Sequence, residues 1–403
     1  MFSLREHVGA LRDARRRPQI PTANVWLTAF ALCVLRFRSF NALEQELRRP
    51  GVWEAWIGPR KPGADTLGRV LSQLNLDDLR QLLLDVHRRM WRAKAIRGRY
   101  RSHLRVVALD GHELWSSEAR CCPDCLTREV RSGQGTVTQY YHRVVTACWI
   151  DVTLPVIIDM EPIRPGEGEV VAARRLMRRL LADYRRLIDV FTGDALYLEA
   201  RFCNEVLAAG KHFVVVMKQE ARDIYQDADR LRRLIQPEVT ADETTTTRTW
   251  DLADLKTFTN LSAPVRVLWV EEDRKTVKVV GGRRQSEVEH STWVWVTDLP
   301  QPAASTTAVV RWGHHRWDIE NRTFNELSTH WSMDHCFRHN TNASLALLLT
   351  MALALATTAL FYERNLQAPA RRHRTRLALV IRFVEDIVAC RGISVWPRAG
   401  PSG

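Results

Sequence analysis

Hydrophobic residues follow one another without a polar break in one short stretch of the chain. Val106 to Leu109 are four consecutive apolar residues, a pattern typical of a strand that is buried on both faces in the middle of a sheet. Asp110 and Gly111 come directly afterwards. A carboxylate at the exit of such a strand lies where open α/β folds bind ligands, although an Asp-Gly turn explains the pair equally well. The pattern predicts a central strand within the stretch Leu104 to His112, with Asp110 at its exit.

Strands and helices alternate after this first strand. The pattern predicts two strands and then a helix: His142 to Asp151, Leu154 to Ile163, and Gly168 to Tyr184. It then predicts a strand, a helix and a strand: Leu187 to Thr192, Tyr197 to Ala209, and His212 to Met217. This order resembles the ribonuclease H-like fold, whose first three strands are antiparallel and whose last two are parallel. The first and fourth strands are neighbours in that fold. The resemblance implies that Asp110 and Asp194, which follow those two strands, converge.

Residues 1 to 100 have a helical pattern that prolines interrupt. Thr66 to Gln73 predicts a short helix, and the Leu-Asn-Leu-Asp-Asp-Leu sequence that follows predicts a turn and the N-cap of the next helix. Arginines crowd this region, as in Arg15 to Arg17. We expect a small helical DNA-binding unit, and the alternative is a helical bundle whose charges merely face water.

Strand-like patterns interrupt the core between Ala221 and Ala308. A charged helix over Ile224 to Leu234 precedes them, and together they predict a β-rich insertion. Several tryptophans lie within or beside the insertion, where they either pack it or stack on unpaired bases. The strand-like runs are Thr245 to Asp251, Val265 to Val270, Thr276 to Val280 and Ser291 to Val296.

The chain returns to the core after this insertion. On a helix, Arg316 and Glu320 share one face with the apolar residues Phe324 and Leu327, because the spacings are four, four and three. A carboxylate on such a partly buried face needs a partner or a metal ion. An ordinary salt bridge from Arg316 to Glu320 is the alternative.

One later stretch, Ala343 to Phe361, is uncharged and nearly long enough to cross a bilayer. Six of its residues are alanine and four are Ser or Thr, so we expect a buried core helix and no membrane association. Met1 to Arg17 lacks the apolar segment of a cleavable signal. The eight cysteines are scattered, so we expect a reducing cytoplasm.

Charge narrows the class of partner. The chain has 403 residues, of which 45% are hydrophobic, enough for a real core. Lys and Arg number 59 against 46 Asp and Glu, which gives a net charge of +13 and a pI near 9.7. An acidic polymer is the natural partner of such a chain. Arginine supplies most of the positive charge, and its planar guanidinium pairs well with phosphate, which favours nucleic acid over a membrane.

Metal-ligating residue types also gather around Cys121 to Cys125. Cys122 and Cys125 have the two-residue spacing of a zinc knuckle, but the sequence holds no second Cys-x-x-Cys pair that would complete a tetrahedral zinc site. His112 and His142 flank the pair and are the candidates for the missing ligands. A reduced, cysteine-rich turn without zinc is the alternative.

Several features occur along the chain in a meaningful order: Asp110 on a strand, the sequence Thr192-Gly-Asp-Ala-Leu-Tyr, a β-rich insertion, and Arg316 four residues before Glu320. In this combination the chain resembles the DD[E/D] transposases of bacterial insertion sequences. The resemblance is to the subgroup whose ribonuclease H-like core carries a β-strand insertion before the catalytic Glu. It covers roughly Leu104 to Phe361.

Two positions depart from the signature of that subgroup. Its Tyr, three residues before the Arg, is Gly313 here, and its Lys, seven residues after the Glu, is Leu327. The Lys contacts DNA in the subgroup, and Arg322 or His330 are the candidates to replace it. Further DNA contacts are expected from Arg316 and from a basic run near the C-terminus, Arg371, Arg372, Arg374 and Arg376.

The resemblance implies that Asp110, Asp194 and Glu320 are the catalytic residues and the ligands of two Mg²⁺ ions, which Mn²⁺ could replace. Asp110 would bridge the ions. Mg²⁺ takes few carboxylates and keeps water and phosphate oxygens, so no Cys or His cage is expected. Two ions roughly 3.5 to 4 Å apart stabilise both the attacking and the leaving oxygen of an in-line displacement. Water would first free a 3′-hydroxyl at the element end, and that hydroxyl would then attack target DNA.

Together these features predict an α/β protein with a ribonuclease H-like mixed sheet core, an α-helical N-terminal domain and a β-rich insertion. The resemblance implies a transposase acting on terminal inverted repeats and target DNA, a homodimer in the DNA complex, and a nucleoid-associated cytoplasmic location. The alternatives are a metal-dependent nuclease of the same fold and a non-catalytic, domesticated DNA-binding protein. The expected segments are 1–100 (helical, DNA-binding), 101–220 (core), 221–308 (insertion), 309–365 (core with the Glu320 helix and the buried helix) and 366–403 (basic tail).

Overall fold

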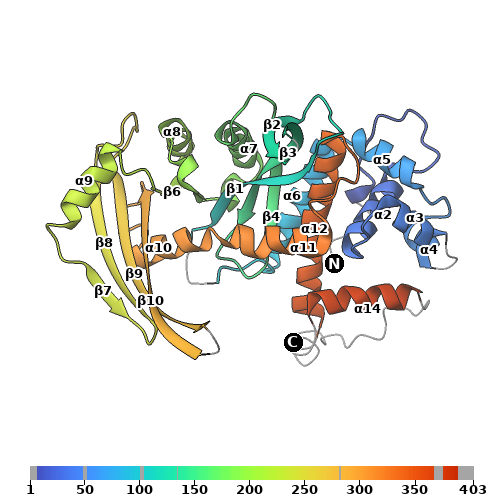
Figure 1. The fold of residues 1–403 in the computed structure, drawn as a ribbon. Coiled ribbons are helices and arrows are strands. Elements are labelled where there is room, and N and C mark those ends of the chain that lie inside the picture. The colour runs from blue at the N-terminus through green and yellow to red at the C-terminus, as the bar shows by residue number, and fades with distance from the viewer. Residues whose placement is uncertain are drawn as a thin grey trace. The chain divides into compact units, whose positions relative to one another are not determined.

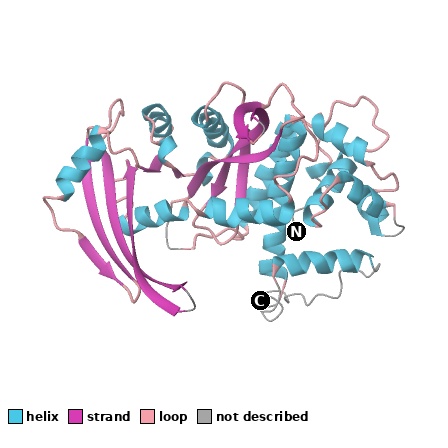
Figure 2. Cartoon of the chain, in the orientation of Figure 1, coloured by secondary structure: helices cyan, strands magenta, loops and turns pink. Residues whose placement is uncertain are grey.

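The computed structural model describes residues 7–48, 52–99, 104–133, 135–280, 283–366 and 375–388. Figure 1 shows the chain as a ribbon, and Figure 2 shows its helices and strands. The chain forms two compact units, each assembled from separate stretches. The first comprises Met1–Arg99, Gly111–Asp183 and Asp318–Gly403, and the second comprises Tyr100–Asp110 and Tyr184–Trp317. The five consecutive segments expected from the sequence stay a prediction about domains.

Helices make up the N-terminal part of the first unit, as the sequence predicts. The side chain of Asn75 accepts hydrogen bonds from the backbone amides of Asp77 and Asp78. This confirms the predicted N-cap, which satisfies amides that the helix itself leaves unpaired. The helices are α2 (Thr22–Val34), α3 (Phe40–Leu47), α4 (Val52–Ile57), α5 (Ala64–Ser72) and α6 (Leu76–Arg92).

The longest of the described helices, α12 (Thr341–Asn365), forms the centre of this unit (Figure 1). It packs against α2, α5, α6 and a strand, and Trp26 Nε1 donates a hydrogen bond to Thr350 Oγ1 at 3.1 Å. Within the described residues it is the one helix long and apolar enough to cross a membrane, and 83% of its most apolar window is buried inside the structure. A helix surrounded by protein is apolar on every side, so the predicted core helix is confirmed. A further helix, α14 (Arg376–Val388), contacts it.

The strands of the first unit differ from the expected ones at two places. The prediction that the first strand ends at Asp110 is wrong, because β1 continues to Ser117 and keeps β3 as a neighbour. Between the first two expected strands, a stretch for which the sequence predicts no strand contains β2, which forms a hairpin with β3 from the Leu126 to Tyr141 pair to the Ser132 to Gly135 pair. The elements are β1 (Val106–Ser117), β2 (Leu126–Ser132), β3 (Gly135–Trp149), β4 (Val156–Pro162) and α7 (Glu169–Asp183).

The last stretch of the first unit before α12 is a helix with a wide turn. The π-helical turn η3 (Glu320–Phe324) is followed directly by α11 (Asn325–Trp331). Ser332 ends α11 in the left-handed conformation, with a φ of 57°. A π-helical turn carries one extra residue per turn, and such turns are frequent at functional sites.

The second unit holds the parallel strands and the insertion. The insertion extends the core sheet, because β10 pairs antiparallel with β6 along Trp295 to Thr297. Two predicted runs merge into one strand, β9, which pairs with β10 over its whole length. The elements are η1 (Arg185–Leu187), β5 (Val190–Gly193), η2 (Ala195–Tyr197), α8 (Ala200–Ala208), β6 (His212–Val216), α9 (Asp223–Arg232), β7 (Glu238–Ala241), β8 (Thr245–Leu255), β9 (Val265–Val280), β10 (Arg283–Thr297) and α10 (Thr306–His315).

Tryptophans pack the insertion. Trp250, Trp269 and Trp295 are 8%, 3% and 1% exposed, and the Arg232 guanidinium lies 4.3 Å from the Trp269 ring centre. Buried rings of this kind are unavailable to bases, so for these three residues packing is the correct alternative.

The strand order gives the fold class. In the second unit it is β1-β5-β6-β10-β9-β8-β7, with β1 parallel to β5 and β5 parallel to β6. In the first unit β3 lies next to β1 and pairs antiparallel with β2 and β4. Strand β1 belongs to both units, which meet in it between Asp110 and Gly111. This mixed sheet with its helices is compatible with the predicted ribonuclease H-like fold.

Candidate active site

Two of the predicted carboxylates follow neighbouring parallel strands. The strands β1 and β5 pair in parallel up to Ala108 opposite Thr192, and Asp110 and Asp194 each come two residues later in the sequence. Neighbouring strands lie about 4.8 Å apart. This pairing is compatible with the convergence that the fold resemblance implies, and the approach of the two carboxylates to one another stays a prediction.

Asp194 is fixed by a tight turn. Its Oδ1 accepts a hydrogen bond from the Leu196 amide at 2.9 Å and so caps η2. Glycine is required immediately before it, because a Cβ at Gly193 would lie 2.6 Å from Cδ2 of Tyr197. The Tyr197 ring is fully buried and has no room to move aside. The Gly-Asp-Ala-Leu-Tyr sequence therefore aims a partly exposed carboxylate from the end of β5.

Asp110 is paired with a buried arginine. Arg316 Nη1 lies 3.2 Å from Asp110 Oδ2, and the two side chains are 7% and 15% exposed. The Arg316 guanidinium also lies 5.0 Å from the Trp317 ring centre. Two neighbouring carboxylates repel one another unless a positive charge stands close by, and Arg316 supplies that charge. The structure therefore shows Arg316 paired with Asp110.

Glu320 belongs to the first unit. It is the first residue of the π-helical turn η3 and is partly exposed. The buried Thr323 in the same turn donates its hydroxyl hydrogen to the Ile319 carbonyl oxygen. Arg316, four residues earlier, is in the second unit. The structure therefore brings Asp110 and Arg316 together, whereas the places of Asp194 and Glu320 beside them stay predictions from the sequence.

A further carboxylate of the first unit lies close to Gly111 of β1. Glu169, in the first turn of α7, lies so close to Gly111 that a Cβ there would collide with its carboxylate. Its Oε2 accepts from Arg143 Nη2 at 2.9 Å, and its side chain is 8% exposed. Gly111 is therefore required for close packing in β1. The sequence alone does not reveal the contact between Gly111 and Glu169, because it depends on how the strand and the helix pack together in the fold.

The two departures from the subgroup signature have clear structural counterparts. At Gly313 the indole of Trp295 fills the space that a side chain would need. Leu327 is fully buried, so this position of α11 faces the protein interior. A lysine there could not reach DNA without unfolding its surroundings. The loss of the lysine thus reflects a helix face used for packing.

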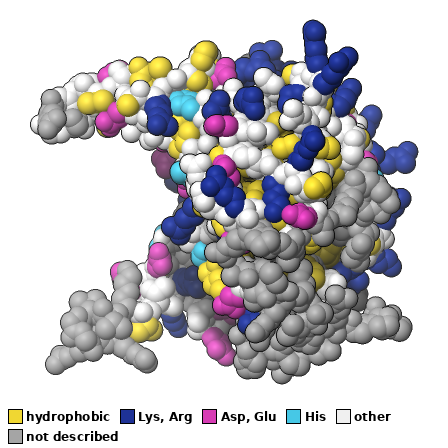
Figure 3. Space-filling model, turned by 90° about the vertical axis from the view of Figure 1, so that its right-hand side faces the viewer, with side chains coloured by type: hydrophobic (Ala, Val, Ile, Leu, Met, Phe, Trp, Pro, Cys, Tyr) yellow, Lys and Arg dark blue, Asp and Glu magenta, His cyan; other side chains and the backbone are white. Residues whose placement is uncertain are grey.

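The predicted DNA-contacting arginines have different surroundings. Arg322 donates to the backbone carbonyls of Val152 and Thr153 at 2.8 and 2.9 Å, and burial lowers its pKa. Arg376 pairs with Glu326 at 3.5 Å. Arg371, Arg372 and Arg374 lie outside the described residues. In Figure 3, Lys and Arg side chains are spread over the visible face with acidic groups among them.

A separate cluster of metal-ligating groups lies in the first unit. Cys122, Cys125, His142 and His339 each offer one ligand atom, and these atoms all lie within 4.8 Å of one another. Burial raises the pKa of Cys125 to about 11 and lowers the pKa of His142. Three of these four residues, Cys122, Cys125 and His142, are candidate zinc ligands from the sequence.

The expected ligand His112 is wrong, and His339 takes its place. His112 Nε2 lies 3.0 Å from Asp334 Oδ1, and its ring stacks on Phe324 with centres 4.5 Å apart. The cluster of ligand atoms does not include His112. His339 is 214 residues from Cys125, and no spacing rule connects residues so distant.

Comparisons with known proteins identify the family. The transposase DDE domain family matches residues 134–356, which is more than half of the 403 residues. The matched range contains Asp194 and Glu320 and begins after Asp110. A search of curated proteins found no match. The chain belongs to the transposase DDE domain family, whose members are enzymes that act on DNA.

Proposed function

We propose that this protein is a DNA transposase that cuts the ends of its own element and joins them to target DNA. The observation that carries the proposal is the parallel pairing of β1 and β5, two neighbouring strands that lead to Asp110 and Asp194. The buried Arg316 paired with Asp110 supports it, because its guanidinium could also bind a phosphate group. The family match supports the same class of enzyme.

The donor set of this site fits a hard divalent cation. Asp110 and Asp194 offer carboxylate oxygens, and both are partly exposed, so an ion and its waters have access to them. Asp110, Asp194 and, from the resemblance, Glu320 would hold two Mg²⁺ ions, for which Mn²⁺ could substitute. Bound there, the ions would stabilise the attacking and leaving oxygens of an in-line displacement at phosphorus.

The residues of the chain would supply position and charge. The backbone of β1 and the capped turn after β5 hold Asp110 and Asp194 in place, so no side-chain rearrangement is needed before DNA binds. The Arg316 guanidinium carries donors that match a phosphate oxygen pair. In the first step a water oxygen bonds to phosphorus as the 3′-oxygen leaves with a proton. In the second, that 3′-hydroxyl oxygen bonds to a target phosphorus and releases a new 3′-hydroxyl.

DNA binding outside the site would rest on the basic surface. The net charge of +13 favours a polyanion. We propose double-stranded DNA as partner, with terminal repeats and target bound by a homodimer in a nucleoid-associated, cytoplasmic complex of a bacterial insertion sequence. The N-terminal helices and the basic run that includes Arg371, Arg372 and Arg374 are the proposed contact regions.

Three variants test the assignment directly. Asp110→Asn, Asp194→Asn and Glu320→Gln each remove a charge with little change in shape, so cleavage of end DNA in Mg²⁺ should fall below detection. DNA affinity should stay within about twofold, because phosphate contacts elsewhere dominate binding. Nicking and strand-joining assays on DNA with the terminal inverted repeats measure both. Cleavage by one of the variants would show that its residue is wrongly assigned.

Matched controls and the joining step separate the alternatives. Asp254→Asn and Glu289→Gln change exposed carboxylates in the insertion and should leave cleavage unchanged. Joining of cut ends to target identifies a transposase. Cutting without joining identifies a nuclease of the same fold, and binding without cutting identifies a non-catalytic relative.

A further inference from the structure

Three distant segments of the first unit meet at one point. The turn Cys121 to Cys125 follows β1, His142 lies in β3, and His339 immediately precedes the N-cap of α12. One sulfur or nitrogen atom of each of the four side chains converges there, all within 4.8 Å of one another. Cys125 and His142 are 7% and 5% exposed, so the group is largely shielded from water.

The distances match those of a tetrahedral zinc site. With Zn–S about 2.3 Å and Zn–N about 2.0 to 2.1 Å, two sulfurs stand roughly 3.8 Å apart and a sulfur and a nitrogen roughly 3.6 Å apart. The Cys122 and Cys125 sulfurs are 3.6 Å apart. His142 Nε2 lies 3.4 and 3.3 Å from these sulfurs, and His339 Nε2 lies 3.2 Å from Cys125 Sγ.

The cysteine turn has the local structure that presents two sulfurs to one ion. The Cys125 amide donates to the Cys122 carbonyl at 3.1 Å, which closes the turn. The Cys122 amide donates to Cys125 Sγ at 3.3 Å, a hydrogen bond that stabilises negative charge on sulfur. Asp124 Oδ2 accepts from Thr341 Oγ1 at 2.8 Å and ties the turn to the start of α12.

An aromatic wall orients both imidazoles. The Trp115 ring centre lies 4.8 Å from that of His142 and 4.5 Å from that of His339. Both histidines present Nε2 to the cysteine sulfurs. Packing of this kind fixes ring orientation, which a metal site requires of its ligands.

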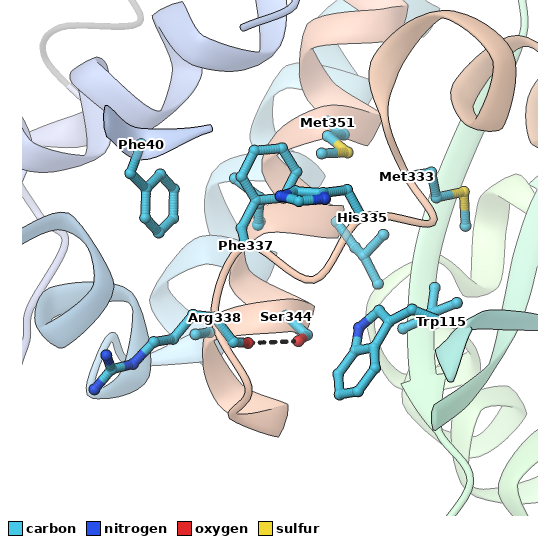
Figure 4. Close-up of a pocket in the computed structure, with 12 residues that line it drawn as sticks. Phe40, Trp115, Met333, His335, Phe337, Arg338, Ser344 and Met351 are labelled. Atoms are coloured by element: carbon cyan, nitrogen blue, oxygen red, sulfur yellow. Dashed lines mark hydrogen bonds between the residues drawn. The ribbon is translucent and has the colours of Figure 1, made fainter. Parts of the chain in front are cut away.

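The segment that carries His339 is itself held by packing (Figure 4). Phe337 lies between Phe40 and His335, with ring centres 5.5 and 4.7 Å away. The Arg338 carbonyl accepts from Ser344 Oγ at 3.4 Å. Figure 4 shows Trp115 across the pocket from Phe40, so the wall that orients His339 also lines this apolar pocket. The ligand is therefore positioned by the fold.

We propose that Cys122, Cys125, His142 and His339 bind one structural Zn²⁺ ion. Four protein ligands complete a tetrahedron and leave no open position, so the ion would not take part in catalysis. It would cross-link the turn after β1, strand β3 and the segment that joins α11 to α12. A link between such distant segments contributes to folding because it closes long loops in the folded state.

Metal analysis of the full-length protein tests the proposal. Protein purified without chelators should contain about one zinc ion per chain. Cys125→Ser and His339→Asn should reduce this content at least about fivefold, since each removes a ligand. Cys121→Ser, on the same turn, and His112→Gln, on β1, should retain full zinc content because neither residue is in the cluster.

A cobalt titration covers the case in which the ligand variants fail to fold. Wild-type protein stripped of metal should bind one Co²⁺ with the intense visible bands of tetrahedral coordination and a sulfur-to-cobalt charge-transfer band. Its thermal midpoint should fall by about 5 °C or more on stripping and recover with Zn²⁺. Absence of zinc together with absence of these bands would overturn the proposal. So would loss of zinc in the Cys121 and His112 controls.

Discussion

Arg316 is the residue on which the electrostatics of the candidate site depend. Its side chain is 7% exposed and reaches Asp110 at 3.2 Å. A buried guanidinium is costly to place unless a carboxylate or phosphate needs it. In the proposed reaction, divalent ions held by the carboxylates would take over the neutralisation of Asp110, and the Arg316 guanidinium would be available to a DNA phosphate.

Replacement of Arg316 should affect the reaction more than DNA binding. Arg316→Gln should lower the rate of end cleavage by about 10²-fold at saturating DNA, the typical cost of losing one preorganised donor. The measurement is single-turnover cleavage in Mg²⁺, with Arg230→Gln as a control, since Arg230 is a mostly exposed arginine on α9. An unchanged rate with a lowered affinity would mean that Arg316 acts only in binding.

Some residues of the site can be predicted from sequence and others cannot. Asp110 and Asp194 follow buried apolar runs, and that local signal survives without any structure. His339 has no such signal, because the residue it joins is 214 positions away. His112 looked equally suitable as a ligand, and only the structure leaves it out of the cluster. Site residues marked by their neighbours in the sequence can be predicted, whereas site residues that only the fold brings together cannot.

At the scale of elements, helix α10 packs unusually close to the insertion. Gly313 lies against the pyrrole side of the Trp295 indole, with no space for a methyl group. Trp295 is 1% exposed and also packs against His314, with ring centres 4.8 Å apart. The glycine at this position thus lets α10 approach β10, and it sets the path of the chain just before Arg316.

A methyl group at Gly313 should destabilise the protein. Gly313→Ala should lower the free energy of unfolding by about 1 to 3 kcal/mol through overpacking. Combined with Trp295→Leu it should cost less than the sum of the single changes, by at least about 0.5 kcal/mol. Chemical denaturation measures both. Gly133→Ala, where a methyl group meets nothing within 4 Å, is the control, and simple additivity would contradict the proposed contact.

Helices and strands could be predicted from the sequence where the protein buries one face of the element or all of it. The apolar strands β5 and β6 and the helix α7 lie close to their expected ranges. Strand β2 was missed because its residues are polar and stay largely exposed in the hairpin. Strand β9 was split in two because charged residues around Asp273 break the apolar pattern, yet the long pairing with β10 carries the strand through them.

At the scale of the whole molecule, stability depends on a histidine buried in the first unit. His87 in α6 is fully buried, and its ring meets Trp149 edge-on with centres 5.5 Å apart. Burial lowers its pKa to about 3. Between this value and the unfolded pKa of about 6.5, the unfolded chain takes up a proton that the folded protein does not.

Acid should therefore weaken the fold through His87. Stability from the neutral imidazole is present above the unfolded pKa and decreases as the pH falls below it. Between pH 6.5 and 5.5 the wild type should lose about 1 kcal/mol more unfolding free energy than His87→Leu. Urea denaturation of both proteins at several pH values measures the difference. Parallel curves for the two proteins would contradict this account, because they would show that His87 takes up its proton in the folded protein as readily as in the unfolded chain.

The long helix α12 has a consequence for how the protein is made. Its residues form the centre of a unit whose other helices begin at Thr22, and Trp26 is hydrogen-bonded to Thr350. A ribosome must add 324 residues after Trp26 before its partner Thr350 is synthesised. Until then α2, α5 and α6 expose the surface that α12 covers, a state that attracts chaperones and proteases. Prematurely terminated chains should thus be degraded before they can compete with the intact enzyme for DNA.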